Sequence, residues 1–133
     1  IHNIFLSREF IISFIQILYM EFVMDMKDRI KSQLGEFPIL LYMKGTPQFP
    51  QCGFSAKVCG ILKASNKRFA FVNILEDHEL REGLKTYSNW PTFPQLYVNG
   101  ELVGGSDIVE QMFNNGELDN VLDSVKYPEE AFS

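Results

Sequence analysis

The chain has 133 residues, 46% of them hydrophobic, which is enough to bury the core of one globular domain. Its formal net charge of -5 and its lack of any run of Lys and Arg argue against a nucleic-acid-binding surface. Two cysteines are too few for a disulfide framework, so we expect a reducing compartment.

The first 23 residues differ in composition from the rest of the chain. They contain an apolar run from Phe10 to Met20, which is too short to span a bilayer. The segment lacks the basic front end and cleavage site of a secretory signal, and it is not Arg-rich like a mitochondrial presequence. Because several methionines could start translation, we interpret residues 1–23 as upstream translated sequence or a disordered extension, with an extra helix as the alternative.

From Met24 the apolar residues recur at helical spacing until Gly35, which predicts a first helix that ends there. The unbroken apolar run Ile39–Met43 is typical of a strand covered on both faces. After a loop with two prolines, apolar residues again recur at helical spacing. This pattern predicts a second helix that begins at or just after Cys52 and ends near Ala64.

A second strand is predicted from Phe69 to Leu75, where aromatic and β-branched residues cluster. The order strand, helix, strand favours a parallel pair joined by a right-handed crossover. Asp77 is placed to cap the following helix, which would turn Leu80 and Leu84 inward.

A hairpin and a final helical region complete the predicted order. Gln95–Val98 and Glu101–Val103 are expected strands joined by a type I′ turn at Asn99-Gly100. Ser106-Asp107 is the expected cap of the next helix, and apolar residues between 118 and 125 mark a final one. The predicted order is αβαβαββα, with room for one more helix at the end.

Cys52 is the candidate reactive residue. At the start of a helix, backbone amides and the helix dipole favour the thiolate, and Lys44 could add a positive charge. Ser55 stands where a Cys-x-x-Cys motif has its second thiol, so Cys52 needs a thiol or a metal from outside the chain. The alternative is a buried structural cysteine. We expect Ser55 to bond backbone amides.

Two other residues need a prediction of their own. Cys59 lies two helical turns after Cys52, about 10 Å away along the axis, so no disulfide can join them. We interpret Cys59 as a core residue. Pro94 follows an aromatic residue at a strand start; alone it would be expected in trans, but together with Cys52 we predict a cis Phe93-Pro94 bond.

Four motifs together resemble the monothiol CGFS-type glutaredoxins, in the short single-domain bacterial form: Lys44-Gly45-Thr46-Pro47, Cys52-Gly53-Phe54-Ser55, Trp90-Pro91-Thr92-Phe93-Pro94 and Gly104-Gly105-Ser106-Asp107. The resemblance covers residues 24–126. It implies an α/β, thioredoxin-like fold with a mixed four-stranded sheet flanked by helices. The expected organisation is an extension at 1–23, a glutaredoxin domain at 24–127 and a tail at 128–133.

The resemblance implies binding of a [2Fe-2S] cluster with glutathione in a bridged homodimer, and transfer of that cluster to acceptor proteins in iron-sulfur assembly and iron and redox homeostasis. A count agrees: a [2Fe-2S] centre takes about four thiolates, and one chain offers one accessible cysteine. The alternative is a glutathione-dependent thiol-disulfide oxidoreductase acting on glutathionylated proteins, an activity expected to be weak at most. A third possibility is a scaffold that recruits BolA-type proteins.

The resemblance also implies residue roles, with Cys52 as the catalytic residue and metal ligand. Lys44 and Arg81 would hold the glycyl carboxylate of glutathione, the Phe93 backbone its peptide, and Ser106 and Asp107 its γ-glutamyl end. Many relatives have cysteine where this chain has Ser106. Because that cysteine is absent here, Cys52 has no internal partner for a disulfide. We expect bacterial cytoplasm, or else a mitochondrial matrix, and no membrane partner. The full set of expected cofactor-binding residues is Lys44, Gly53, Phe54, Arg81, Thr92, Phe93, Pro94, Gly105, Ser106 and Asp107.

Overall fold

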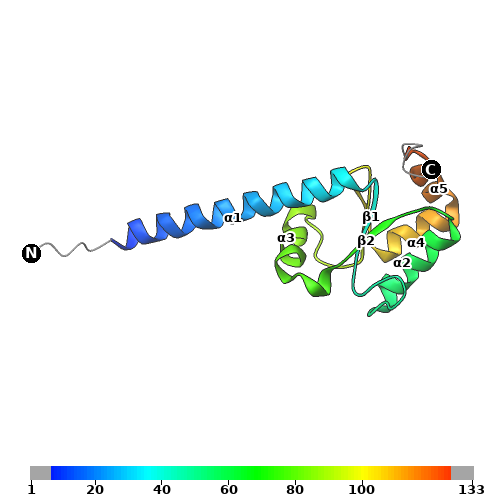
Figure 1. Cartoon of the computed structure of the whole chain (residues 1–133), viewed down its shortest axis with the longest axis horizontal. Helices are drawn as coiled ribbons and strands as arrows, with labels where there is room; N and C mark the ends of the chain where they lie inside the picture. The colour runs from blue at the N-terminus through cyan, green and yellow to red at the C-terminus, as the bar shows by residue number, and fades with distance from the viewer. Residues whose placement is uncertain (1–6, 127–133) are drawn as a thin grey trace, which may run out of the picture.

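The computed structural model describes residues 7–126, in which helices and strands alternate up to a hairpin that is followed by two helices (Figure 1). The predicted tail at 128–133 lies outside the described residues. The elements are α1 (Arg8–Glu36), β1 (Ile39–Met43), α2 (Gly53–Ala64), β2 (Ala70–Asn73), the 3₁₀ turn η1 (Ile74–Glu76), α3 (His78–Ser88), β3 (Gln95–Val98), β4 (Glu101–Gly104), α4 (Ser106–Asn115) and α5 (Glu117–Asp123).

The strands form one mixed four-stranded sheet in the order β2-β1-β3-β4, which confirms the expected architecture. β1 pairs with β2 in parallel and with β3 antiparallel, so that Leu41 stands opposite Phe71 on one side and Leu96 on the other. All five residues of β1 are buried, because this strand is central and has helices on both faces. Its unbroken apolar sequence follows from that position.

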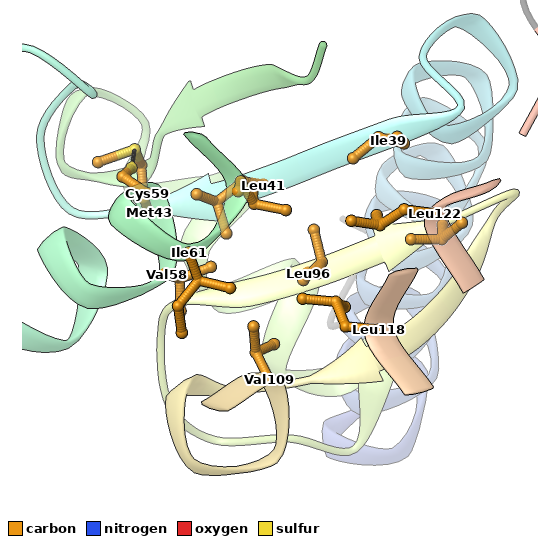
Figure 2. Close-up of a cluster of buried hydrophobic side chains, with 12 residues drawn as sticks. Ile39, Leu41, Met43, Val58, Cys59, Ile61, Leu96, Val109, Leu118 and Leu122 are labelled. Atoms are coloured by element: carbon orange, nitrogen blue, oxygen red, sulfur yellow. Dashed lines mark hydrogen bonds between the residues drawn. The ribbon is translucent and has the colours of Figure 1, made fainter. Parts of the chain in front are cut away.

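Successive residues of β1 contribute to two separate cores, since side chains alternate between the faces of a strand. Ile39, Leu41 and Met43 join the core on the side of α2, α4 and α5, where Figure 2 shows them with Val58 and Leu96. Leu40 and Tyr42 instead join the core under α1 and α3. The members of this second core are Met26, Ile30, Leu34, Leu40, Tyr42, Ile74, Leu80, Leu84, Phe93 and Tyr97.

The first helix is longer than predicted. It begins at Arg8, where the Ser7 hydroxyl accepts a hydrogen bond from the Phe10 amide, and it runs without a break through Met24. Residues 8–23 are helical and extend away from the sheet in Figure 1, which agrees with the helix given as the alternative. That residues 1–23 are upstream translated sequence stays a prediction. Within residues 7–126, no helix is both long and apolar enough to cross a membrane.

Several local predictions are confirmed. The Asp77 carboxylate caps α3 by accepting from the Leu80 amide at 3.0 Å, and Leu80 and Leu84 are buried. The hairpin turn has positive φ at Asn99 (53°) and Gly100 (81°), as a type I′ turn requires. The extra helix near the end is α5.

Two of the differences from the predicted boundaries have a local cause. β2 ends at Asn73 rather than Leu75, because the Asn73 side chain accepts the Leu75 amide and turns the chain into η1. Ser106-Asp107 does not cap α4: the N-cap is Gly105, and Ser106 is already the first helical residue. The Ser106 hydroxyl is thereby left for another partner.

Candidate functional site

A cavity of about 570 Å³ lies where β1, the start of α2, the loop before β3 and the start of α4 meet. Its lining includes ten of the eleven residues predicted for the site; of these, only Gly53 is outside it. Trp90, Pro91 and Ile108 also line the cavity but were not among the predicted site residues. Trp90 and Pro91 were named only in their motif, and the place of Ile108 in the first turn of α4 could have indicated it. The lining is Lys44, Cys52, Phe54, Arg81, Trp90, Pro91, Thr92, Phe93, Pro94, Gly105, Ser106, Asp107 and Ile108.

Cys52 lies at the cavity as the N-cap residue of α2 and is half-buried, which excludes the alternative of a structural core cysteine. The backbone N–H of Ser55, in the first turn of α2, is the main cause of a lowered pKa for the Cys52 thiol. The Phe54 amide, the Lys44 charge and the Ser55 hydroxyl add to this, while burial opposes it. A lowered thiol pKa means more thiolate near neutral pH, and the thiolate is the nucleophile and metal ligand.

The loop before Cys52 is held closely against α2. Ser55 is fully buried and its hydroxyl accepts the backbone N–H of Lys44 at 3.1 Å, which confirms that it bonds a backbone amide. The Gln51 amide donates to the Lys44 carbonyl at 2.9 Å, so the two ends of the loop are joined. These bonds fix Lys44 beside the thiol.

Another part of the lining is the segment Trp90–Pro94, which contains the predicted cis Phe93-Pro94 bond. Phe93 is buried in the core under α1 and α3, whereas Thr92 is exposed. Phe54, one of the expected cofactor-binding residues, is exposed at the cavity, and Trp90 is half-buried there.

Three cavity residues carry a buried polar atom that has no hydrogen-bond partner in the structure: Arg81 Nε, Trp90 Nε1 and Ser106 Oγ. Buried donors are satisfied in nearly all folded proteins, so such a group calls for an explanation such as a ligand. Two of the three can only donate, which favours a ligand rich in acceptors. The N-terminus of α4 also lines the cavity, and a helix N-terminus favours a negatively charged ligand.

Cys59 is part of the core, as predicted. It is 2% exposed, its sulfur lies 3.5 Å from Met43 Sδ, and burial raises the pKa of its thiol (Figure 2). The described residues contain no cluster of three or more His, Cys, Asp or Glu side chains that could hold a metal ion. Residues 7–126 therefore do not supply a full set of such ligands for a metal bound at Cys52.

Comparison with known proteins agrees with this geometry. The sequence model of the Glutaredoxin family matches residues 39–103. Glutaredoxin 4 of Pasteurella multocida is 52% identical over 109 residues, which are 80% of this chain and all of that protein. Monothiol glutaredoxin-4 of Schizosaccharomyces pombe is 48% identical over 98 residues, 74% of this chain and 40% of that one. The chain belongs to the monothiol glutaredoxins.

The fold of this glutaredoxin is similarly shared with solved structures. The solution structure of reduced poplar apo GrxS14 is 49% identical and superposes with a TM-score of 0.66 over 74% of this chain and 90% of that one. The crystal structure of a buckwheat glutaredoxin-glutathione complex has a TM-score of 0.70 over 78% and 93%, at 17% identity, and thus shows likeness of fold alone. The thioredoxin-like fold is confirmed.

Proposed function

We propose that the cavity binds glutathione with its sulfur beside Cys52. The observation that carries this proposal is the set of buried donors without partners, at Arg81, Trp90 and Ser106, around a thiol with a lowered pKa. Glutathione has two carboxylates, two amide carbonyls and one amine, and so supplies many acceptors and a single cation. The glutathione in the buckwheat complex, which has the same fold, is in keeping with this choice.

The charges of the cavity suggest how glutathione is oriented. Lys44 and Arg81 are the cations of the lining and would take the glycyl carboxylate, because guanidinium and ammonium groups form strong bonds to carboxylates. Asp107 is its only acid and would take the γ-glutamyl amine, while the N-terminus of α4 at Ser106 would take the adjacent carboxylate. Between these two ends, the Phe93 backbone would pair with the peptide of glutathione.

We further propose that the cargo of this glutaredoxin is a [2Fe-2S] cluster. The cluster takes about four thiolates, and of the two cysteines only Cys52 is accessible. Two chains, each contributing Cys52 and one bound glutathione, would supply all four. Such a homodimer would deliver its cluster to acceptor proteins, with BolA-type proteins as partners, in the bacterial cytoplasm.

The test is anaerobic reconstitution of the protein with iron, sulfide and glutathione, followed by visible absorption and gel filtration. We expect a coloured dimer for the wild type and for Cys59→Ala, since Cys59 is buried. Cys52→Ser should stay colourless and monomeric. Equal cluster loading in Cys52→Ser and wild type would refute the carrier proposal.

A second candidate function rests on the same lowered pKa of Cys52. The Cys52 thiolate would attack the glutathione sulfur of a glutathionylated protein, releasing that protein's thiolate and leaving a Cys52-glutathione disulfide. A second glutathione thiolate would then attack this disulfide to give glutathione disulfide and regenerate Cys52. Fast turnover of a glutathionylated protein by a colourless monomer would favour this enzyme function over the carrier.

A further inference from the structure

Gln95 is a polar residue with a completely buried side chain, placed where the sheet meets the cavity wall. It is the first residue of β3 and is 0% exposed. Its Nε2 donates to the backbone carbonyls of Trp90 at 3.0 Å and Thr92 at 3.2 Å. One side chain therefore holds two points of the segment that lines the cavity, and both hydrogens of its amide are used.

The orientation of this carboxamide is fixed from the other side by Tyr97. The Tyr97 hydroxyl donates to Gln95 Oε1 at 3.0 Å. Burial raises the pKa of Tyr97 to about 12, so the hydroxyl keeps its proton near neutral pH and acts as a donor. The Trp90 and Thr92 carbonyls can only accept, so the NH₂ group must face the segment, and the carboxamide oxygen then faces the Tyr97 hydroxyl.

The Thr92 carbonyl shares a planar peptide unit with the N–H of Phe93. That unit is trans, since Phe93-Pro94 is the only cis bond among residues 7–126. In a trans peptide the carbonyl and the N–H point in opposite directions. Holding the Thr92 carbonyl on buried Gln95 thus directs the Phe93 N–H away from the core, on the side of the cavity that Phe93 lines.

We propose that Gln95 is a positioning residue, which turns the Thr92–Phe93 peptide so that its N–H can pair with the peptide backbone of a γ-glutamyl-cysteinyl thiol such as glutathione. This inference rests on the proposed function and adds the residue that prepares the backbone contact. Gln95 does not touch the ligand. It acts through the two carbonyls that it holds.

The test compares two disulfide exchanges at Cys52, with glutathione disulfide and with the disulfide of 2-mercaptoethanol. In each, Cys52 gains a mixed disulfide and one free thiol is released, and mass spectrometry gives the equilibrium constant. Mercaptoethanol has no peptide group for Phe93, so the ratio of the two constants isolates the peptide contact from the chemistry of the thiol. The variants are Gln95→Met, which keeps the length of the side chain without its hydrogen bonds, and Tyr97→Phe.

We expect Gln95→Met to lower the glutathione constant about tenfold, the effect of roughly one hydrogen bond, and to leave the mercaptoethanol constant unchanged. Tyr97→Phe frees the carboxamide to turn and should lower the ratio by a smaller factor. The matched control is Gln33→Met, which removes the acceptor of the Tyr42 hydroxyl in the same core, away from the cavity, and should change neither constant.

An unchanged ratio in Gln95→Met would overturn the inference, and so would an equal loss with both disulfides, which indicates general damage. If Gln95→Met does not fold, an unchanged ratio in Tyr97→Phe overturns it instead. A wild-type protein with no preference for glutathione over mercaptoethanol would refute the proposed function. A wild-type preference that Gln95→Met retains would refute only the role of Gln95.

Discussion

Gly45 controls the loop that carries Lys44 and leads to Cys52, and its replacement by alanine gives a sharp prediction. Its φ of +91° lies in the region that side chains with a Cβ rarely adopt. A Cβ there would lie 2.5 Å from the Phe49 carbonyl oxygen and 2.7 Å from the Gln51 nitrogen. Both are backbone atoms, so the loop itself must move.

The expected cost has two parts. The left-handed backbone conformation costs an ordinary residue about 1–2 kcal/mol. Overpacking against fixed atoms adds about 1–3 kcal/mol. The matched control is Gly100→Ala, because Gly100 also has positive φ (+81°) but no atom within 4 Å of its Cβ position. It should cost only the first part.

Urea unfolding measures both variants, and Gly45→Ala should lose about 1–3 kcal/mol more than Gly100→Ala. Since the loop positions the charge of Lys44, which lowers the pKa of Cys52, Gly45→Ala should also slow alkylation of Cys52 by iodoacetamide near pH 7. Gly100→Ala should not. Equal destabilisation of the two variants, with equal alkylation rates, would refute this reasoning about the loop.

Three further predictions concern the thiols, a helix cap and the core. Iodoacetamide near pH 7 should modify Cys52, with a rate profile that inflects below the usual pKa of a free thiol, and spare buried Cys59; equal labelling would contradict the site. Asp77→Ala removes a helix cap and the ion pair with Arg29, and should cost about 1 kcal/mol in urea unfolding at pH 7. Because the fold lowers the pKa of Asp77, its contribution is complete above the unfolded value of about 3.9 and is lost as the pH falls through the folded value; a gap between wild type and variant that stays constant down to acid pH would contradict this. Leu41→Ala, in the central strand and fully buried, should cost about 2–5 kcal/mol, and a loss well below 1 kcal/mol would show that the core is not where the structure places it.

Local patterns were enough to predict most of the architecture. The unbroken apolar run Ile39–Met43 indicates a central strand because a strand with both faces covered has no polar side. The cap at Asp77 was also predictable from local sequence, because capping depends only on neighbouring backbone amides. The predicted cap of α4 was wrong, because Gly105, Ser106 and Asp107 can each occupy the N-cap position. Sequence spacing alone does not decide which of them does.

Other features arise only from tertiary contacts. The buried donors at Arg81 and Trp90 come from separate segments and become unpartnered only when the fold covers them. In the sequence, Gln95 is an ordinary polar strand residue. Its two carbonyl partners are known only from the folded structure, where the loop before β3 packs against it. A helix over residues 8–23 was only the alternative prediction, since an apolar run without a polar face has no helical period to detect.

We propose that Cys52 binds a [2Fe-2S] cluster together with thiols from outside its own chain. Native mass spectrometry of the protein reconstituted without oxygen tests it most directly, because the mass counts every component. We expect a species of two chains, one [2Fe-2S] unit and two glutathione molecules, which disappears in Cys52→Ser. A cluster held by one chain, or by two chains without glutathione, would contradict it.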